Sequence, residues 1–157
     1  MKKQKIILGT DHAGFELKEE IKKYLQEQGF EVEDAGVHEY NSKDDYPVFI
    51  EAAAKKVAED PGKNKGIIFG GSGQGEAIVA NKIKGIRAAV YYGNNMDIVK
   101  LSRIHNNANI LSIGARFIPK EEAIKAVKLW LETDFINEER HSRRINQVKE
   151  IEERTCK

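Results

Sequence analysis

Short apolar runs alternate with amphipathic stretches along most of the chain. Five runs have the composition of strands, at residues 5–9, 30–34, 66–69, 86–92 and 109–114. After each of them, apolar residues recur at intervals of three and four, the spacing of a helix with one buried face. Alternating strands and helices predict parallel strands joined by crossover helices. We therefore expect a three-layer, Rossmann-like α/β fold, an open parallel sheet of about five strands with helices on both faces.

The predicted helices begin and end at recognisable residues. The first ends near Gly29, a residue typical of helix C-termini, and the second begins at Pro47. Three further helices are predicted from apolar spacing, at residues 76–83, 94–105 and 120–133.

A last helical pattern, at about residues 137–154, is polar except for one stripe of Ile145, Val148 and Ile151. So narrow a stripe can pack on the sheet of the same chain or on a second subunit, and we favour the second subunit. No linker, repeat or low-complexity segment divides the sequence, so residues 1–157 are interpreted as a single domain.

Composition argues against several classes of protein. The 26 Lys and Arg residues nearly balance the 25 Asp and Glu residues, which gives no global attraction to nucleic acid or to an acidic membrane. No apolar run approaches the roughly 20 residues of a membrane span, and only three apolar residues follow the basic N-terminus before Gly9. The one cysteine, Cys156, supports no disulfide framework. We expect a cytoplasmic protein with no nucleic-acid or membrane partner.

Polar clusters flank three of the predicted strands. Ligands of open parallel sheets bind beyond the carboxyl ends of the strands. "TDHAG" and "GGSGQGE" follow the first and third strands, and we place "RIHNNAN" with them although it precedes its strand. "GAR", with Arg116, follows the last strand. These clusters are the expected binding site.

The glycine-rich loop "GGSGQGE" ends in Glu76, an unusual residue for a phosphate-binding turn. It does not match the dinucleotide fingerprint, because Glu76 takes the place of the third glycine, and no Lys-Ser/Thr follows as in a P-loop. Its glycines still allow backbone N–H groups to approach an anion at a helix N-terminus. The alternative is a tight turn whose acidic residue gains about 0.3–1 kcal/mol from the helix dipole.

Arginines near the C-terminus offer a separate phosphate site. Arg140 and Arg144 are four residues apart and share a helix face, and His141 lies three residues before Arg144. Arginine pairs bind phosphate oxygens bidentately, and Arg116 can join them. The alternative is a solvated basic surface, which we prefer for Arg143.

If those arginines hold a phosphate, the glycine loop is free to stabilise an oxyanion that forms during a reaction. Glu76 can then remove the proton whose loss creates that oxyanion, as in proton abstraction next to a carbonyl. A helix N-terminus weakens a carboxylate as a base, so this role requires burial or closure of the site to raise the pKa of Glu76.

Two histidines are candidates for a second proton carrier, His12 and His105, although a lone histidine is more often structural. Asp11 can orient His12 or bind substrate hydroxyls. No His, Asp or Glu spacing indicates a metal site, which argues against a metal-assisted hydride shift. We expect neither a metal nor another cofactor.

Five motifs in the same order resemble the B type of ribose-5-phosphate isomerase, a family that also includes galactose-6-phosphate isomerase subunits. The resemblance runs from about Lys5 to Ile151 and rests on "GTDHAGFELK", "DYP", "GGSGQGEAIVANKIKGIRAA", "LSRIHNNANILSIGAR" and "ERHSRRI". It implies the interconversion of ribose 5-phosphate and ribulose 5-phosphate in the pentose phosphate pathway, through a cis-enediolate and without a metal.

The resemblance also implies roles for individual residues. Many relatives use a cysteine as the base, but "FGGSG" contains none, so this chain resembles an acidic-base branch with Glu76 as base. His105 matches the proton donor associated with ring opening. The substrate-binding positions are Asp11, His12, Tyr46, Gly71, Ser72, Gly73, Gln74, Gly75 and Asn106. The phosphate-binding positions are Arg116, Arg140 and Arg144, with His141 assisting.

Relatives form dimers, sometimes paired into tetramers, with sites built across the interface. The resemblance therefore implies a homodimer that binds a phosphorylated sugar. Two alternatives stay open. One is an isomerase of galactose 6-phosphate or allose 6-phosphate. The other is a non-catalytic module that binds sugar phosphate and needs the arginines and glycines but not Glu76 or His105.

Overall fold

The structure is a computed structural model that describes residues 4–156. Its centre is one parallel sheet of five strands in the order β2-β1-β3-β5-β4. The strands are β1 (Lys5–Thr10), β2 (Glu31–Asp34), β3 (Lys65–Gly70), β4 (Ala88–Tyr91) and β5 (Ile110–Gly114). The predicted strands and their parallel pairing are confirmed.

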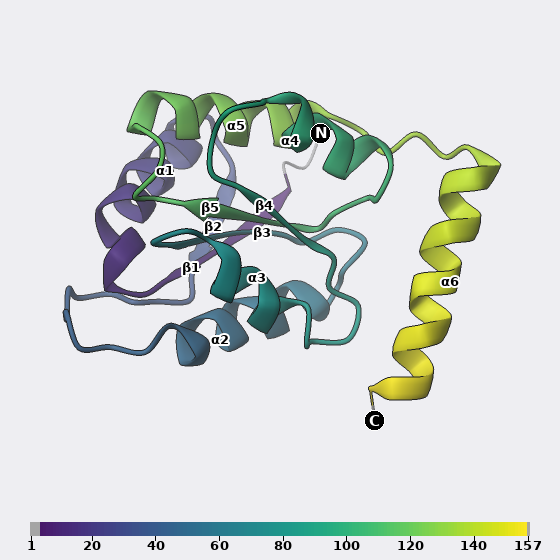
Figure 1. Ribbon diagram of the computed structural model, residues 1–157. Helices are drawn as coiled ribbons and strands as arrows, with labels where there is room; N and C mark the ends of the chain where they lie inside the picture. Colours follow the sequence, from purple (N-terminus) through teal and green to yellow (C-terminus); the bar gives the residue numbers. More distant parts are fainter. Residues whose placement is uncertain (1–3, 157) are drawn as a thin grey trace.

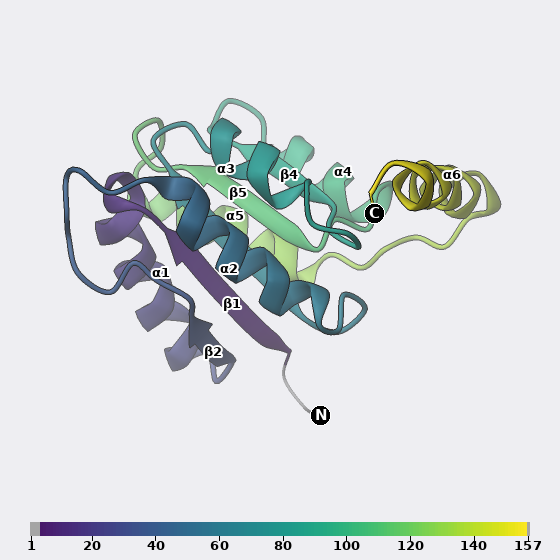
Figure 2. The ribbon, with the colours of Figure 1, turned by 90° about the horizontal axis from the view of Figure 1, so that it is seen from below.

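Helices cover both faces of this sheet, as predicted (Figures 1 and 2). One face carries α1 (Phe15–Glu27), α4 (Asp97–Ile104) and α5 (Lys120–Glu132), and the other carries α2 (Tyr46–Ala58) and α3 (Gln74–Ala80). A short 3₁₀ turn (His12–Gly14) precedes α1, and α6 (Glu139–Thr155) closes the chain.

The core consists of two layers, one on each face of the sheet, because successive side chains of a strand point to opposite faces. On β1, Ile6 and Leu8 pack in the layer that includes Trp130 of α5, whereas Ile7 packs in the layer that includes Ile50 of α2. All five of these side chains are fully buried. A continuous apolar run such as "IIL" therefore requires helices on both sides.

A buried lysine ties α1 to the loop that follows β2. Lys18 is fully buried, and its Nζ donates to Asp34 Oδ2 and to the carbonyl of Val37, each at 2.6 Å. Burial alone would raise the pKa of Asp34, but hydrogen bonds from Lys18 and the Gly36 N–H hold it below its ordinary value. The two hydrogen bonds therefore join α1 to the end of β2 and to the start of the loop that leads to α2.

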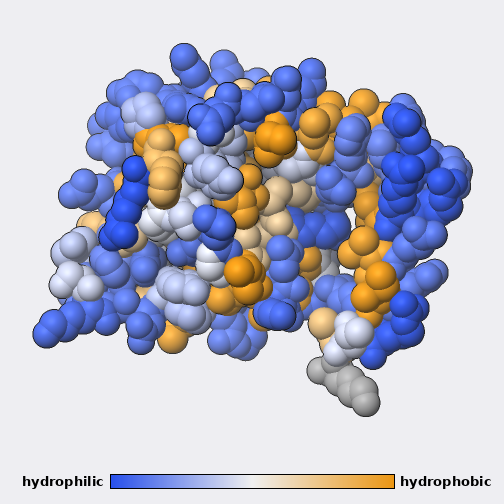
Figure 3. Space-filling view, in the orientation of Figure 1, coloured by the Kyte–Doolittle hydropathy of each residue, from blue (hydrophilic) through white to orange (hydrophobic). Residues whose placement is uncertain are grey.

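The C-terminal helix α6 stands beside the rest of the domain (Figures 1 and 2). Val148 and Ile151 are 55% and 52% exposed. They line a groove of about 490 Å³ between α6 and residues of β4 such as Ala88 and Ala89. In Figure 3, apolar side chains follow the face of α6 that turns toward the hollow. That α6 packs on a partner subunit stays a prediction.

Within residues 4–156, no helix combines the length and the apolar character needed to cross a membrane.

Candidate active site

Three of the polar clusters meet at the carboxyl edge of the sheet. β1 leads into Asp11, β3 leads into the glycine loop, and β5 leads toward Arg116. The strands pair in register there, with Thr10 beside Phe69 and Gly70 beside Gly114. Parallel pairing therefore brings together loops that lie far apart in the sequence.

Glu76 lies in the first turn of α3 and is only 5% exposed. Its side chain folds back over the end of β3. A Cβ placed on Gly70 would therefore lie only 1.8 Å from Glu76 Oε1. Burial raises the pKa of Glu76, its own backbone N–H opposes that rise, and the charge of Asp11 adds to it. The carboxylate is thus a stronger base than its place at a helix N-terminus suggests.

The glycine loop is shaped by close packing as well as by backbone angles. Gly73 has φ 80°, and a Cβ there would lie 3.0 Å from the Ile113 carbonyl carbon. Its own carbonyl accepts a 2.6 Å hydrogen bond from Ser112 Oγ. Within residues 4–156, the N–H groups of Ser72 and Gly73 donate no hydrogen bond, so both are available to an anion.

Tyr46 and Arg116 border this loop on two sides. A Cβ on Gly75 would lie 2.6 Å from the Tyr46 hydroxyl, so the tyrosine packs against the loop. A Cβ on Gly71 would lie 3.2 Å from Arg116 Nη1, and the Arg116 N–H donates to the Gly71 carbonyl. Arg116 therefore belongs to the Glu76 side of the site.

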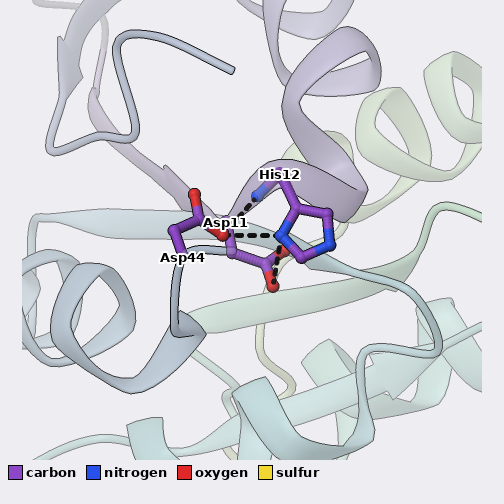
Figure 4. A group of neighbouring side chains, drawn as sticks. All are labelled: Asp11, His12 and Asp44. Carbon is purple, nitrogen blue, oxygen red and sulfur yellow. Dashed lines mark hydrogen bonds and ion pairs between the residues drawn. The ribbon is translucent and has the colours of Figure 1, made fainter. Parts of the chain in front are cut away.

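Two carboxylates lie near His12, and the sequence predicted only Asp11. Asp11 is 6% exposed, and its Oδ1 accepts the Ala13 N–H. The second carboxylate is Asp44, whose Oδ1 lies 2.6 Å from His12 Nδ1 (Figure 4). Asp44 comes from the loop before α2, and no motif or spacing connects it with His12.

Ligand atoms of Asp11, His12 and Asp44 all lie within 4.8 Å of one another, the spacing of a possible metal site that the sequence did not predict. Hydrogen bonds already engage this group. His12 Nδ1 is bonded to Asp44, and Asp11 Oδ1 is bonded to Ala13.

A second group of predicted residues gathers at the opposite edge of the sheet. The rings of His105 and His141 stack with their centroids 4.6 Å apart. A pocket of about 240 Å³ is lined by these two histidines with Asn106, Arg140 and Arg144. Burial lowers the pKa of His141, as do the nearby His105 and Arg140, while Glu138 opposes the shift. The pocket combines two guanidinium groups with ring and amide donors, a set suited to phosphate.

The placement of "RIHNNAN" beside the other clusters was therefore wrong for a single chain. α4 runs back from the carboxyl end of β4 and delivers His105 to the amino end of β5. A strand rises about 3.3 Å per residue, so the two edges of the five-residue β5 lie roughly 15 Å apart. Arg116 likewise does not join Arg140 and Arg144 within one chain.

The chain matches known proteins over nearly its full length. Residues 6–148 match the family described as Ribose/Galactose Isomerase. Ribose-5-phosphate isomerase B of Mycobacterium tuberculosis is 41% identical over 152 residues, which are 97% of this chain and 92% of that protein.

Solved structures agree with this match. Ribose-5-phosphate isomerase B from Mycoplasma genitalium, with bound ribulose-5-phosphate, superposes with a TM-score of 0.91 at 36% identity and covers 96% of this chain and 97% of that one. The Clostridium thermocellum enzyme gives a TM-score of 0.89 at 41% identity, over 96% of this chain and 98% of that one. By sequence and by structure, this chain belongs to the Ribose/Galactose Isomerase family.

Proposed function

We propose that this protein interconverts D-ribose 5-phosphate and D-ribulose 5-phosphate by metal-free proton transfer through a cis-enediolate. The observation that carries the proposal is Glu76, a buried carboxylate with a raised pKa, in a glycine loop where the Ser72 and Gly73 N–H groups donate no hydrogen bond within residues 4–156. A relative of the same fold binds ribulose-5-phosphate, the ketose of this pair. The reaction is a step of the pentose phosphate pathway, and we place it in the cytoplasm.

The chemistry needs one base that works in both directions. Glu76 removes the proton from C2 of the open-chain aldose and returns it to C1, while the proton of the C2 hydroxyl passes to the C1 oxygen, so no net proton is lost. As the proton leaves, negative charge develops on the carbonyl oxygen, where the N–H groups of Ser72 and Gly73 stabilise it. Asp11, His12 and Tyr46 bind the sugar hydroxyls beside the loop.

The phosphate and ring-opening groups come from a second copy of the chain. Arg140, Arg144 and His141 bind the phosphate, and His105 donates the proton that opens the furanose ring. These residues lie at the far edge of the sheet from Glu76 in one chain. A complete site therefore requires a homodimer in which the His105 pocket of one subunit faces the Glu76 loop of the other.

The surface of the chain supports such a dimer. The groove beneath α6 is lined by Val148 and Ile151, which are about half exposed. Ile78 on α3, two residues beyond Glu76, is 62% exposed. These exposed apolar residues of α6 and α3 would be buried if α6 of each subunit packed against its partner.

The proposal is tested by incubating the purified chain with ribose 5-phosphate and following ribulose 5-phosphate formation, with and without a chelator. Galactose 6-phosphate and allose 6-phosphate are assayed in parallel. Conversion of the pentose in the presence of the chelator supports the proposal. Conversion of the six-carbon sugars alone, or of none of the three, contradicts it.

Replacing Gly70 with alanine is expected to lower kcat about 10- to 100-fold without unfolding the protein. The added methyl group would collide with the Glu76 carboxyl, the flexible end of a side chain, and push it from its position. The measurement is kcat for ribose 5-phosphate, together with the thermal unfolding midpoint.

The matched control is Gly62→Ala, where a Cβ would meet only Asp60 Oδ1 at 3.9 Å. This variant is expected to keep wild-type turnover. Wild-type kcat in Gly70→Ala would show that the observed carboxylate position is not the reactive one.

A further inference from the structure

Asp44 makes two hydrogen bonds to His12, next to Asp11 at the carboxyl edge of the sheet. Its Oδ1 accepts the backbone N–H of His12 at 3.1 Å and lies 2.6 Å from the Nδ1 of the same residue. The Asp44 side chain is only 7% exposed. Its other oxygen, Oδ2, is buried without a hydrogen-bond partner among residues 4–156. Leaving a buried oxygen without a partner costs stability, and such a group calls for an explanation.

The hydrogen bond to Nδ1 determines which ring nitrogen of His12 carries a proton. An ionised carboxylate can only accept hydrogen bonds, so the short contact requires a proton on Nδ1. In the neutral ring, Nε2 is then the acceptor. Figure 4 shows this second nitrogen on the side of the ring that faces away from both Asp11 and Asp44.

Other contacts keep the ring in this orientation. Asp11 Oδ2 lies 3.8 Å from His12 Nδ1, on the same side as Asp44. The ring of Tyr40 meets the imidazole edge-on at a centroid distance of 6.1 Å. With one nitrogen and the backbone N–H both bonded to Asp44, the imidazole has little freedom to flip.

We propose that Asp44 is a positioning residue for the isomerase reaction. It holds His12 in the Nδ1–H form, with Nε2 directed at a sugar hydroxyl. Asp44 does not touch the substrate and acts only through His12. This inference rests on the proposed function for its substrate. A purely structural role, in which Asp44 only anchors the loop before α2, would instead make its effect independent of His12.

The first test substitutes Asp44 with asparagine, which keeps the shape of the side chain. Asparagine removes the negative charge that favours a proton on Nδ1, so the Nε2–H form of His12 becomes more populated. We expect ¹⁵N NMR of the labelled protein to show Nδ1–H for His12 in the wild type and a larger share of Nε2–H in Asp44→Asn. Nε2–H in the wild type would overturn the proposal, whatever the catalytic activity of the protein.

The second test is kinetic, and we expect Asp44→Asn to lower kcat/KM for ribose 5-phosphate about 10- to 100-fold, because the ring is no longer held with Nε2 as the acceptor. Unchanged kcat/KM would overturn the proposal. Asp60→Asn, the same substitution at an exposed turn, is the control and should behave as the wild type.

A double-mutant cycle separates positioning from anchoring. His12→Asn keeps a donor near Asp44 but lacks Nε2, so it should lose activity while Asp44 stays paired. Adding Asp44→Asn to this background should then change kcat/KM less than about twofold, because the two residues act as one unit. Losses that multiply across the cycle would show that Asp44 acts without His12 and would overturn the proposal.

Discussion

Replacing Glu76 with glutamine is expected to lower kcat about 10²- to 10⁴-fold, the usual contribution of a general base. Glutamine fills the same space over Gly70 but cannot take a proton from carbon. Because the buried charge is removed without leaving a cavity, the protein should fold normally. The measurements are steady-state turnover of ribose 5-phosphate and the free energy of unfolding of the same preparations.

The control is Glu121→Gln, which changes an exposed acid in the first turn of α5. It tests whether loss of any first-turn carboxylate affects turnover, and we expect no change. Turnover by Glu76→Gln within tenfold of the wild type would contradict the assignment of the base.

The raised pKa of Glu76 also predicts a dependence of stability on pH. Where the folded-state pKa of an acid exceeds its unfolded value, the native state binds more protons than the unfolded state between the two values, so stability falls as pH rises through this window. Glu76→Gln removes the effect. Its free energy of unfolding should therefore exceed that of the wild type at neutral pH and approach it at low pH.

Mixing two inactive variants should restore activity. Glu76→Gln and His105→Asn each damage one half of the site, and the two halves lie at opposite edges of the sheet. If a complete site takes one half from each subunit, a mixed dimer has one site with both residues intact. Random pairing makes about half of the dimers mixed, so co-refolded protein should regain roughly a quarter of wild-type turnover.

Each variant refolded alone is the control and should stay inactive. Absence of recovery, despite mixed dimers detected by mass or by a tag, would place both residues in one chain's site. Recovery would also place Arg140 and Arg144 across the interface from Glu76 of the other subunit, since both line the pocket of His105.

Local sequence patterns predicted the elements and their layered arrangement but not where the loops that carry His105 and Asp44 lie. The apolar runs and the periodic stretches between them identified all five strands and the helices, because alternation and helical spacing are properties of neighbouring residues. The glycine loop and Glu76 were also recognisable, since a strand followed by glycines and a helix places that loop at the carboxyl edge.

The position of His105 needed the structure. Its motif precedes β5, and only the return path of α4 shows that it lies at the opposite edge from Glu76. The pairing of Asp44 with His12 spans 32 residues and has no sequence signal. Both depend on where separate loops end in space, which no local pattern specifies.

The sequence alone thus determined the layered α/β fold and indicated a candidate base and candidate phosphate-binding residues, because each follows from short-range periodicity or from residue chemistry. The tertiary structure decided which of these residues meet. It buried the Glu76 carboxylate over Gly70 and thereby raised its pKa. It also divided the candidate site between two sheet edges. In a parallel sheet, each strand ends at the carboxyl edge and the helix that follows runs back toward the amino edge, so motifs at the two ends of a helix lie at opposite edges.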